Sequence, residues 1–339
     1  MHTPTNGDFR MPRRQSIFAA AGALAAASLL LAGCASGTAE AEPSTAAATT
    51  VTIEDNHGEV EVPVNPKRVV ALDNHVFETL SAWDIPLAAA PKGVMGTDIW
   101  PEYTGDEAVL DVGAHFEPNL ESIVAAQPEL IIGGYRFAES YDQIVSQNPD
   151  AAVIEIAPRE GEDPAAELVR QVEILGQIFD REDEAAKIVA DFEQSIADAK
   201  EAYDGSSTVV SLMTSGGEIS YIAPVTGRGL GMLYPALDLK PGIEQAADDT
   251  SHGDDISVEA IAAANPDWIV VIDREGAMTD AEGYVPAKQL IEGSEALANV
   301  TAVKRGQVVY VDPAFYLRED IQTYTGVYEQ LAKAFGAAS

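Results

Sequence analysis

The sequence predicts an α/β protein with two similarly built lobes, joined by one long helix and enclosing a cleft. Three observations support this prediction. Strand-like and helix-like segments alternate from Val51 to the end of the chain, and a helix–proline–strand unit occurs twice. A stretch between the two copies, without glycine or proline, has helical periodicity. The 339 residues, 46% of them apolar, are enough for two lobes that each bury a core.

The folded part is predicted to start with a β-hairpin. From Val51 the sequence VTIEDNHGEVEV alternates between apolar and polar residues around the turn Asn56-His57-Gly58. The run Arg68-Val69-Val70-Ala71-Leu72 is apolar after its first residue, which predicts a buried strand, and a helix is expected near 76–83.

The repeated unit predicts that the two lobes have related structures. Residues 118–132 read PNLESIVAAQPELII, and residues 256–270 read ISVEAIAAANPDWIV. An offset of 138 residues aligns Glu121 with Glu259 and also superimposes the apolar positions and the proline. Each copy is predicted to be a short helix, a proline-marked turn and a buried strand.

Residues 181–203 are predicted to form the helix that connects the lobes. The stretch has one apolar stripe at helical spacing, made of Ala185, Ile188, Val189, Phe192, Ile196 and Ala199. About 23 residues give a helix of roughly 35 Å. The predicted domains are therefore an N-terminal lobe over 51–180, this helix, and a C-terminal lobe over 204–339. A single rigid connection predicts limited hinge motion.

The N-terminus has the features of an export signal. Arg10, Arg13 and Arg14 precede the apolar run Ile17–Ala32, which is short for a membrane span of about 20 residues. The run ends in Leu31-Ala32-Gly33-Cys34, which resembles a bacterial lipobox. Residues 1–33 are therefore predicted to be a lipoprotein signal peptide, with Cys34 lipidated and 34–50 forming a flexible tether. The paired arginines leave both general secretion and twin-arginine export open.

The charge of the chain limits its partners. It has 20 basic and 55 acidic residues, a net charge of −35, and without residues 1–33 these become 17 and 54, a net charge of −37. Nucleic acid and diffuse binding to anionic membranes are therefore disfavoured. Because Cys34 is the only cysteine, the mature chain would have neither a disulfide nor a catalytic thiol.

Several strings resemble one family of binding proteins. SHGDDIS at 251–257, NPDWIVVIDR at 265–274 and VVYVDPAFYL at 308–317 are similar to the ferric-siderophore-binding lipoproteins of ABC importers, of the catecholate type that includes petrobactin and enterobactin binders. The resemblance implies two Rossmann-like lobes with a helical backbone (class III). It also implies a monomeric carrier on the outer face of the bacterial cytoplasmic membrane, with a separate permease and ATPase. The ferric siderophore would be a transported ligand and not a permanent cofactor.

Three arginines are candidates for holding an anionic ligand. Arg136, Arg228 and Arg274 each lie just beyond an apolar run or in a glycine-rich loop, where open α/β sheets bind ligands. Their planar guanidinium groups suit catecholate oxygens. They match the arginine triad of the family, whereas surface ion pairs are the commoner role of a single arginine.

Two further residues are candidates for direct contact with iron. The resemblance implies that His252 and Tyr316 complete the coordination of ferric iron when the siderophore supplies only four donors, and both side chains suit that ion. For His252, a loop histidine bonded to backbone is the alternative. Tyr316 lies in a string that is one residue shorter than the family's, and Arg318-Glu319-Asp320 is unusually charged for this position.

Other residues could line the cleft or contact the permease. Tyr135 and Trp100, with Tyr103 and Phe315, could stack on catechol rings or be packing residues. The resemblance also implies that one exposed glutamate on each lobe, Glu121 and Glu259, docks the permease. Acidic residues are also favoured at helix starts without any such role.

Two other functions remain as alternatives. The same fold could bind haem, cobalamin or a hydroxamate siderophore, although a neutral hydroxamate complex would not need three arginines. An exported hydrolase could use Ser251 and His252, but the chain has no Gly-x-Ser-x-Gly elbow. It also has no phosphate-binding Gly-Lys-Ser/Thr loop, so we expect a carrier that is not an enzyme and whose ATPase is another chain.

Overall fold

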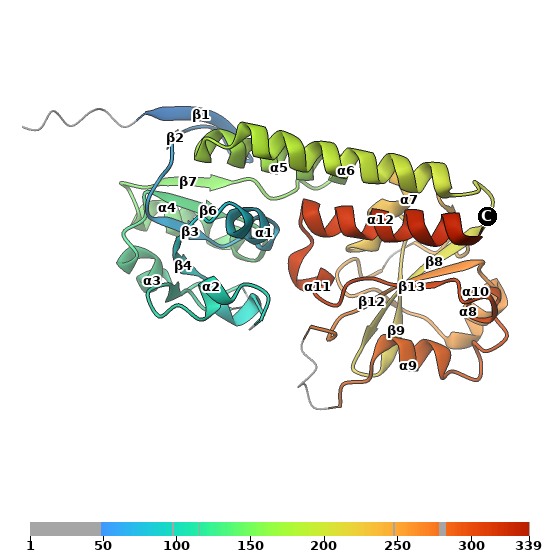
Figure 1. The fold of residues 1–339 in the computed structure, drawn as a ribbon. Coiled ribbons are helices and arrows are strands. Elements are labelled where there is room, and N and C mark those ends of the chain that lie inside the picture. The colour runs from blue at the N-terminus through green and yellow to red at the C-terminus, as the bar shows by residue number, and fades with distance from the viewer. Residues whose placement is uncertain (1–48, 97, 115, 247, 278–282, 339) are drawn as a thin grey trace, which may run out of the picture. The chain divides into compact units, whose positions relative to one another are not determined.

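The computed structural model describes residues 49–96, 98–114, 116–246, 248–277 and 283–338. The predicted signal peptide (1–33), Cys34, most of the predicted tether and His115 lie outside the described residues. Residues Ala47–Ser339 form one compact unit (Figure 1).

The first half of this unit contains a hairpin, five further strands and the helices between them. The elements are β1 (Thr50–Asp55), β2 (Gly58–Pro63), β3 (Val69–Ala71), α1 (Asn74–Ala82), β4 (Leu87–Ala90), α2 (Pro101–Thr104), β5 (Leu110–Asp111), α3 (Leu120–Ala125), β6 (Leu130–Gly133), α4 (Tyr141–Gln147), β7 (Ala152–Glu155) and α5 (Pro164–Phe179).

The second half begins with the longest helix. Its elements are α6 (Glu182–Ala202), β8 (Thr208–Ser215), β9 (Glu218–Ile222), α7 (Leu233–Leu237), β10 (Lys240–Pro241), β11 (Asp254–Asp255), α8 (Val258–Ala264), β12 (Trp268–Asp273), α9 (Ala287–Glu292), α10 (Thr301–Arg305), β13 (Val308–Tyr310), α11 (Phe315–Arg318) and α12 (Ile321–Ala338). Short 3₁₀ turns cover Lys92–Val94, Tyr135–Ser140 and Leu230–Met232.

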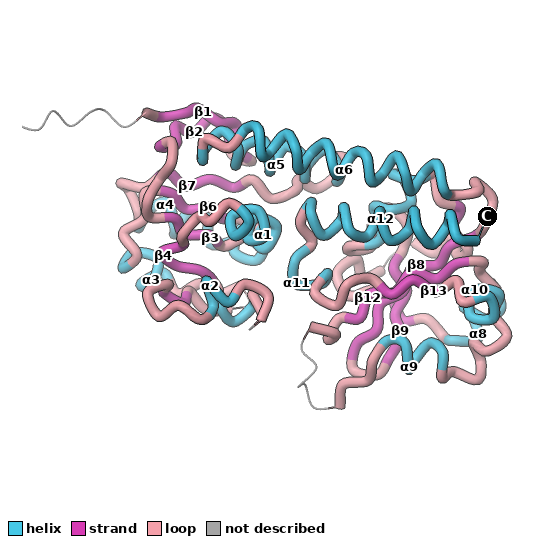
Figure 2. Tube along the Cα trace, in the orientation of Figure 1, coloured by secondary structure: helices cyan, strands magenta, loops and turns pink. Residues whose placement is uncertain are grey.

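Each predicted lobe contains its own sheet. The N-terminal sheet has the order β5-β4-β3-β6-β7 and is entirely parallel. The C-terminal sheet has the order β11-β9-β8-β12-β13, with β10 also paired to β8. Strand β9 runs opposite to all the other strands of this sheet. Figure 2 shows the two sheets as separate groups of strands. The predicted α/β class is confirmed.

The predicted local elements are present. The hairpin is formed by β1 and β2 around Asn56-His57, and the strand and helix expected near 68–83 are β3 and α1. The two repeats are α3–β6 and α8–β12, and both strands lie next to the strand of their sheet that comes first in the chain, β3 or β8. The repeat in the sequence therefore corresponds to a repeat in the structure.

The two sheets share one apolar core on their inner faces. Side chains alternate along each strand, so Val69 of β3 and Val270 of β12 belong to the same buried cluster, whereas Val70 and Ile269 face separate outer clusters. The outer clusters are covered by α3 and α4 on one sheet and by α8, α9 and α10 on the other. Both faces of each sheet are thus buried, as parallel sheets require.

The predicted connecting helix is α6, and it packs along α12 (Figure 1). Ala185, Phe192 and Ala199 of its predicted stripe are buried. The ring of Phe192 lies 5.8 Å from that of Tyr328, and Phe335 near the end of α12 contacts Trp268 of β12 at 4.9 Å. Helix α12 therefore packs between the connecting helix α6 and the C-terminal sheet.

The lobes also contact each other directly, through α1 of the first lobe and through α11 and α12 of the second. The Asn74 side-chain amide donates to the carbonyl of Leu317 at 2.7 Å, and this bond is buried. The Thr79 hydroxyl contacts the side-chain amide group of Gln322.

None of the helices in the described ranges combines the length and the hydropathy that a bilayer-spanning helix needs.

Removing the Phe192 ring is expected to destabilise the protein. We predict that Phe192→Ala lowers the free energy of unfolding by about 3–5 kcal/mol, because it leaves a cavity between α6 and α12. The measurement is urea unfolding followed by circular dichroism. The control is Val145→Ala, which shortens a side chain that is 39% exposed and should cost roughly 0.5 kcal/mol or less. Equal losses for both variants would contradict this packing.

Asp320 is expected to make stability fall as pH rises. Burial, and then the charge of Glu78, raises the pKa of this carboxyl to about 6, although Thr323 donates to its Oδ1. Its Oδ2 has no partner among the described residues. Because the folded pKa lies above the ordinary value, the protonated acid stabilises the fold, and that contribution is lost as pH rises from about 4 to 6.

Asp320→Asn should remove this pH dependence. The asparagine Oδ1 still accepts from Thr323, so the stability of the variant relative to the unchanged chain should rise between pH 4 and pH 7 by about 1–3 kcal/mol. Urea unfolding of both proteins at several pH values measures this difference in the free energy of unfolding. All other carboxyl groups are common to both proteins, so a difference that does not change with pH would contradict the assignment.

Candidate functional site

A cavity of about 840 Å³ is lined by both lobes. His75 and Arg136 reach it from just beyond β3 and β6, and Arg274 reaches it from just beyond β12. These are carboxyl ends of parallel strands, the edge at which α/β sheets bind ligands. The cleft predicted between the lobes is therefore present, and its volume is that of a small-molecule site.

The three predicted arginines all line this cavity, in two different settings. Arg136 and Arg274 are separated by 138 residues, the same offset that relates the two copies of the repeat. Each therefore follows the equivalent strand of its own lobe. Arg136 has no ion pair or hydrogen bond among the described residues and its buried Nε has no partner, while Arg274 donates one hydrogen bond, to the Ser215 hydroxyl at 3.1 Å. Both retain donors for a ligand.

Arg228 is already paired. It lies in the glycine-rich turn before α7, and its Nε and Nη2 donate to the carboxylate of Glu319 at 2.6–2.9 Å. Its Nη1 donates to the Tyr316 hydroxyl at 2.9 Å. Burial opposes the charge of this guanidinium, but the charge and hydrogen bonds of Glu319 raise its pKa. A buried, doubly hydrogen-bonded pair of this kind is held firmly, because removing either partner strands a charge.

Backbone geometry at both partners supports this pairing. Glu319 is 5% exposed and has a φ of 51°, in the left-handed region that ends α11. Gly229 next to Arg228 has a φ of 73°, and a Cβ there would lie 2.8 Å from the ring of Phe315. The turn can therefore approach α11 closely only with glycine at 229.

Tyr316 lines the cavity, and the guanidinium groups of the two C-terminal arginines lie over its ring. The ring centroid is 4.1 Å from the Arg228 guanidinium and 5.3 Å from that of Arg274, and the residue is 6% exposed. Its hydroxyl oxygen accepts from Arg228 and still has a lone pair. The predicted position in the cleft is thus found, and α11 provides it.

His252 also lines the cavity. It lies on a loop, and its side chain is 53% exposed. Its Nδ1 lies 3.5 Å from an Asp249 carboxylate oxygen, and its backbone N–H donates to the other oxygen of that carboxylate at 3.1 Å. Among the described residues its Nε2 has no hydrogen bond. The aspartate could therefore orient the ring with Nε2 toward a ligand.

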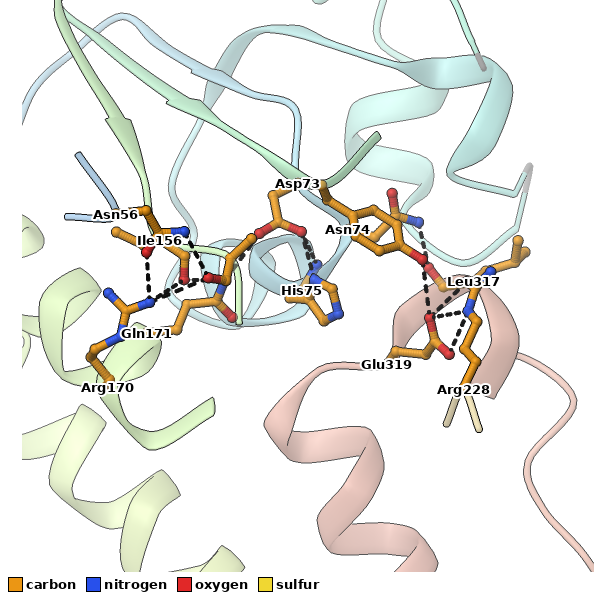
Figure 3. A network of polar contacts seen from close by, with 12 residues as sticks. Asn56, Asp73, Asn74, His75, Ile156, Arg170, Gln171, Arg228, Leu317 and Glu319 are labelled. Carbon is orange, nitrogen blue, oxygen red and sulfur yellow. Dashed lines mark hydrogen bonds and ion pairs between the residues drawn. The ribbon is translucent and has the colours of Figure 1, made fainter. Parts of the chain in front are cut away.

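Tyr135 and His75 line the cavity on its N-terminal side, and His75 is not among the residues predicted from the sequence. Their rings meet edge to face at 4.9 Å. Burial alone would lower the pKa of His75, but the charge and hydrogen bond of Asp73, at 2.7 Å, raise it. Figure 3 shows Asp73 bonded in turn to Gln171. The signal was available, because His75 follows a buried strand as Arg136 does.

Trp100 corrects one prediction. It is 1% exposed, packs its ring on Phe77 at 5.2 Å, and donates to a Glu78 carboxylate oxygen at 3.0 Å. It does not line the cavity, and Tyr103 and Phe315 are core residues as well, since apolar packing around them outweighs any role on the cleft surface. Two aromatic residues that line the cavity were not predicted, namely Phe116, which is 66% exposed, and Tyr324, which is buried.

Glu121 and Glu259 occupy equivalent exposed positions. Each is in the first turn of its helix, α3 or α8, and the N-cap side chain of Asn119 or Ser257 accepts a backbone N–H of the same turn. Neither glutamate forms an ion pair within the described parts of the chain. Both carboxylates are therefore available to a partner, and both also complement the helix dipole.

The chain is similar to known binding proteins over most of its length. The family model described as periplasmic binding protein matches residues 69–315. The petrobactin-binding protein YclQ of Bacillus subtilis is 32% identical over 269 residues (77% of this chain, 78% of YclQ), and its crystal structure superimposes with a TM-score of 0.71, covering 85% of this chain and 99% of that one.

Two further proteins are similar over most of their length. The ferric-anguibactin-binding protein FatB of Vibrio anguillarum is 28% identical over 290 residues, 85% of this chain and 88% of FatB. The periplasmic catecholate-siderophore binding protein VctP of Vibrio cholerae is 25% identical with a TM-score of 0.70, covering 85% of this chain and all of that one. The family match extends over more than half of the residues and across both sheets, and the chain therefore belongs to the periplasmic binding protein family.

Proposed function

We propose that this chain captures a ferric siderophore of the catecholate type outside the cytoplasm and delivers it to the permease of an ABC importer. The observation that carries the proposal is the pair of arginines with free donors, Arg136 and Arg274, which face one cavity from opposite lobes. On a chain with a net charge of −35, such a pair is a local exception that suits an anionic ligand. Relatives named for petrobactin and anguibactin support the same class.

The remaining parts of the proposal concern iron and partners. His252 and Tyr316 would complete the coordination of iron in a siderophore complex, and Tyr135 would contact the ligand. Cys34 would carry the lipid that anchors a monomer at the membrane, Glu121 and Glu259 would contact the permease, and the ATPase would be a separate chain. The positions of His252, Tyr316 and Tyr135 on the cavity wall support the roles in ligand binding. The exposure of the two glutamates supports their role in contacting the permease.

The geometry does not favour hydrolysis. The backbone N–H groups of Ser251 and His252 both donate to Asp249 Oδ1, and Asp254 accepts the backbone N–H groups of Asp248 and Asp249. The carboxylates of this loop thus shape its backbone, and no hydrogen bond among the described residues joins Ser251 to the His252 ring. A triad needs that bond.

Ligand titration tests the proposal. Intrinsic fluorescence of the detergent-solubilised full chain should be quenched by ferric catecholates at sub-micromolar concentrations, about −8.2 kcal/mol or tighter. Ferric hydroxamates, haem and cobalamin provide the comparison, since they lack the anionic catecholate groups that two free arginines would bind. Binding of only haem or cobalamin would exclude the siderophore assignment.

Replacing both proposed iron ligands tests their role. His252→Ala with Tyr316→Phe should lower affinity for a complex with four siderophore donors by about tenfold or more and shift its charge-transfer band, because two iron positions lose their protein donors. A complex with six siderophore donors should change little. Tyr141→Phe, outside the cavity, is the control for removing a phenol group. Equal losses for the two kinds of complex would argue against direct coordination.

A further inference from the structure

The hydrogen bonds of Arg228 leave it little capacity for a ligand. A guanidinium group has five N–H donors. Three of the Arg228 nitrogens donate to protein acceptors: Nε and Nη2 to Glu319, Nη2 also to the Tyr316 carbonyl at 3.3 Å, and Nη1 to the Tyr316 hydroxyl. One N–H, on Nη1, remains. Arg228 therefore cannot present two parallel donors to an anionic chelating group, as Arg136 and Arg274 can.

Glu319 occupies the place where an anionic ligand oxygen would meet Arg228. Among the described residues that line the cavity it is the one acidic residue, and its side chain is almost fully buried. The Tyr135 hydroxyl also lies 3.5 Å from its carboxylate. A second anion placed here would meet Glu319 in a poorly solvated setting, where repulsion between like charges is strong.

The Arg228–Glu319 ion pair also positions the hydroxyl of Tyr316. Arg228 stacks on the Tyr316 ring at 4.1 Å and donates to its hydroxyl, and Glu319 holds Arg228 from the other side. The hydrogen bond and the stacking together hold the Tyr316 hydroxyl in one position at the cavity. Arg228 is then a positioning residue for Tyr316.

We propose that Glu319 makes this site selective for ferric complexes with two anionic chelating groups over those with three. Arg136 and Arg274 would each hold one group, and Glu319, by engaging Arg228, would exclude a third. A ferric bis-catecholate has four oxygen donors and one net negative charge, which leaves two iron positions open. A tris-catecholate has six donors and three negative charges. The inference rests on the proposed function and specifies its ligand class.

The test compares three ferric complexes at fixed ionic strength, namely a bis-catecholate, a tris-catecholate and a neutral tris-hydroxamate. The detergent-solubilised full chain should bind the bis-catecholate about tenfold or more tighter than the tris-catecholate. Glu319→Gln keeps an acceptor for Arg228 but removes the charge, so it should narrow this gap by about tenfold through tighter binding of the tris-catecholate. Glu129→Gln, whose carboxylate pairs with Arg68 on the surface, is the matched control and should leave the ratio unchanged.

A second set of variants separates positioning from ligand contact. Arg136→Gln and Arg274→Gln should each weaken bis-catecholate binding by about tenfold. The double variant Arg228→Gln with Glu319→Gln removes both charges together, so no buried charge is stranded. It should weaken binding by less than about threefold while shifting the charge-transfer band, because Tyr316 loses its donor. Unfolding midpoints verify that each variant is folded.

The outcomes distinguish this inference from the proposed function. If the unchanged chain binds none of the ferric complexes, the proposed function fails and this inference fails with it. If it binds them but Glu319→Gln leaves the ratio of the two catecholate affinities unchanged, only the selectivity inference is overturned. A loss for the double variant as large as that for Arg136→Gln would likewise show that Arg228 contacts the ligand.

Discussion

The shared core between the two sheets is the constraint on which the rest of the structure depends. Inner-face residues of β3 and β12 belong to one buried cluster that also contains Phe192 of α6 and Tyr328 of α12. Separating the lobes would expose part of that cluster to water, at about 25 cal/mol for each Å² of apolar surface. The cavity therefore lies between two lobes whose buried apolar residues form one continuous cluster.

The repeat explains why this scaffold places like charges opposite each other. In each lobe a helix, a turn and a central strand lead to the same edge of the sheet, and Arg136 and Arg274 follow those strands at the same offset. Glu319 and Arg228 are not part of the repeat. The cavity thus combines two arginines at equivalent positions of the two lobes with one ion pair that belongs to the C-terminal lobe alone.

Local patterns predicted most of the fold and part of the site. Periodicity was sufficient for α6, for the hairpin and for both repeat units, because each depends on neighbouring residues. Trp100 was assigned wrongly, since an aromatic side chain beside a proline has the same sequence signature whether it packs inward or lines a cleft. The pairing of Arg228 with Glu319 was not predictable, because it joins residues 91 positions apart whose approach is determined by the turn at Gly229 and the left-handed end of α11.

The directions of the elements in each repeat have a mechanical consequence. Helix α3 connects the parallel strands β5 and β6, so its first turn and the carboxyl end of β6 lie at the same edge of the sheet, and α8 is related to β12 in the same way. Glu121 and Arg136 therefore belong to one rigid unit, and Glu259 and Arg274 to another. A protein that bound both glutamates would fix the spacing of the two arginines. By thermodynamic linkage, binding of that protein and binding of the anionic ligand would change each other's affinity by the same factor.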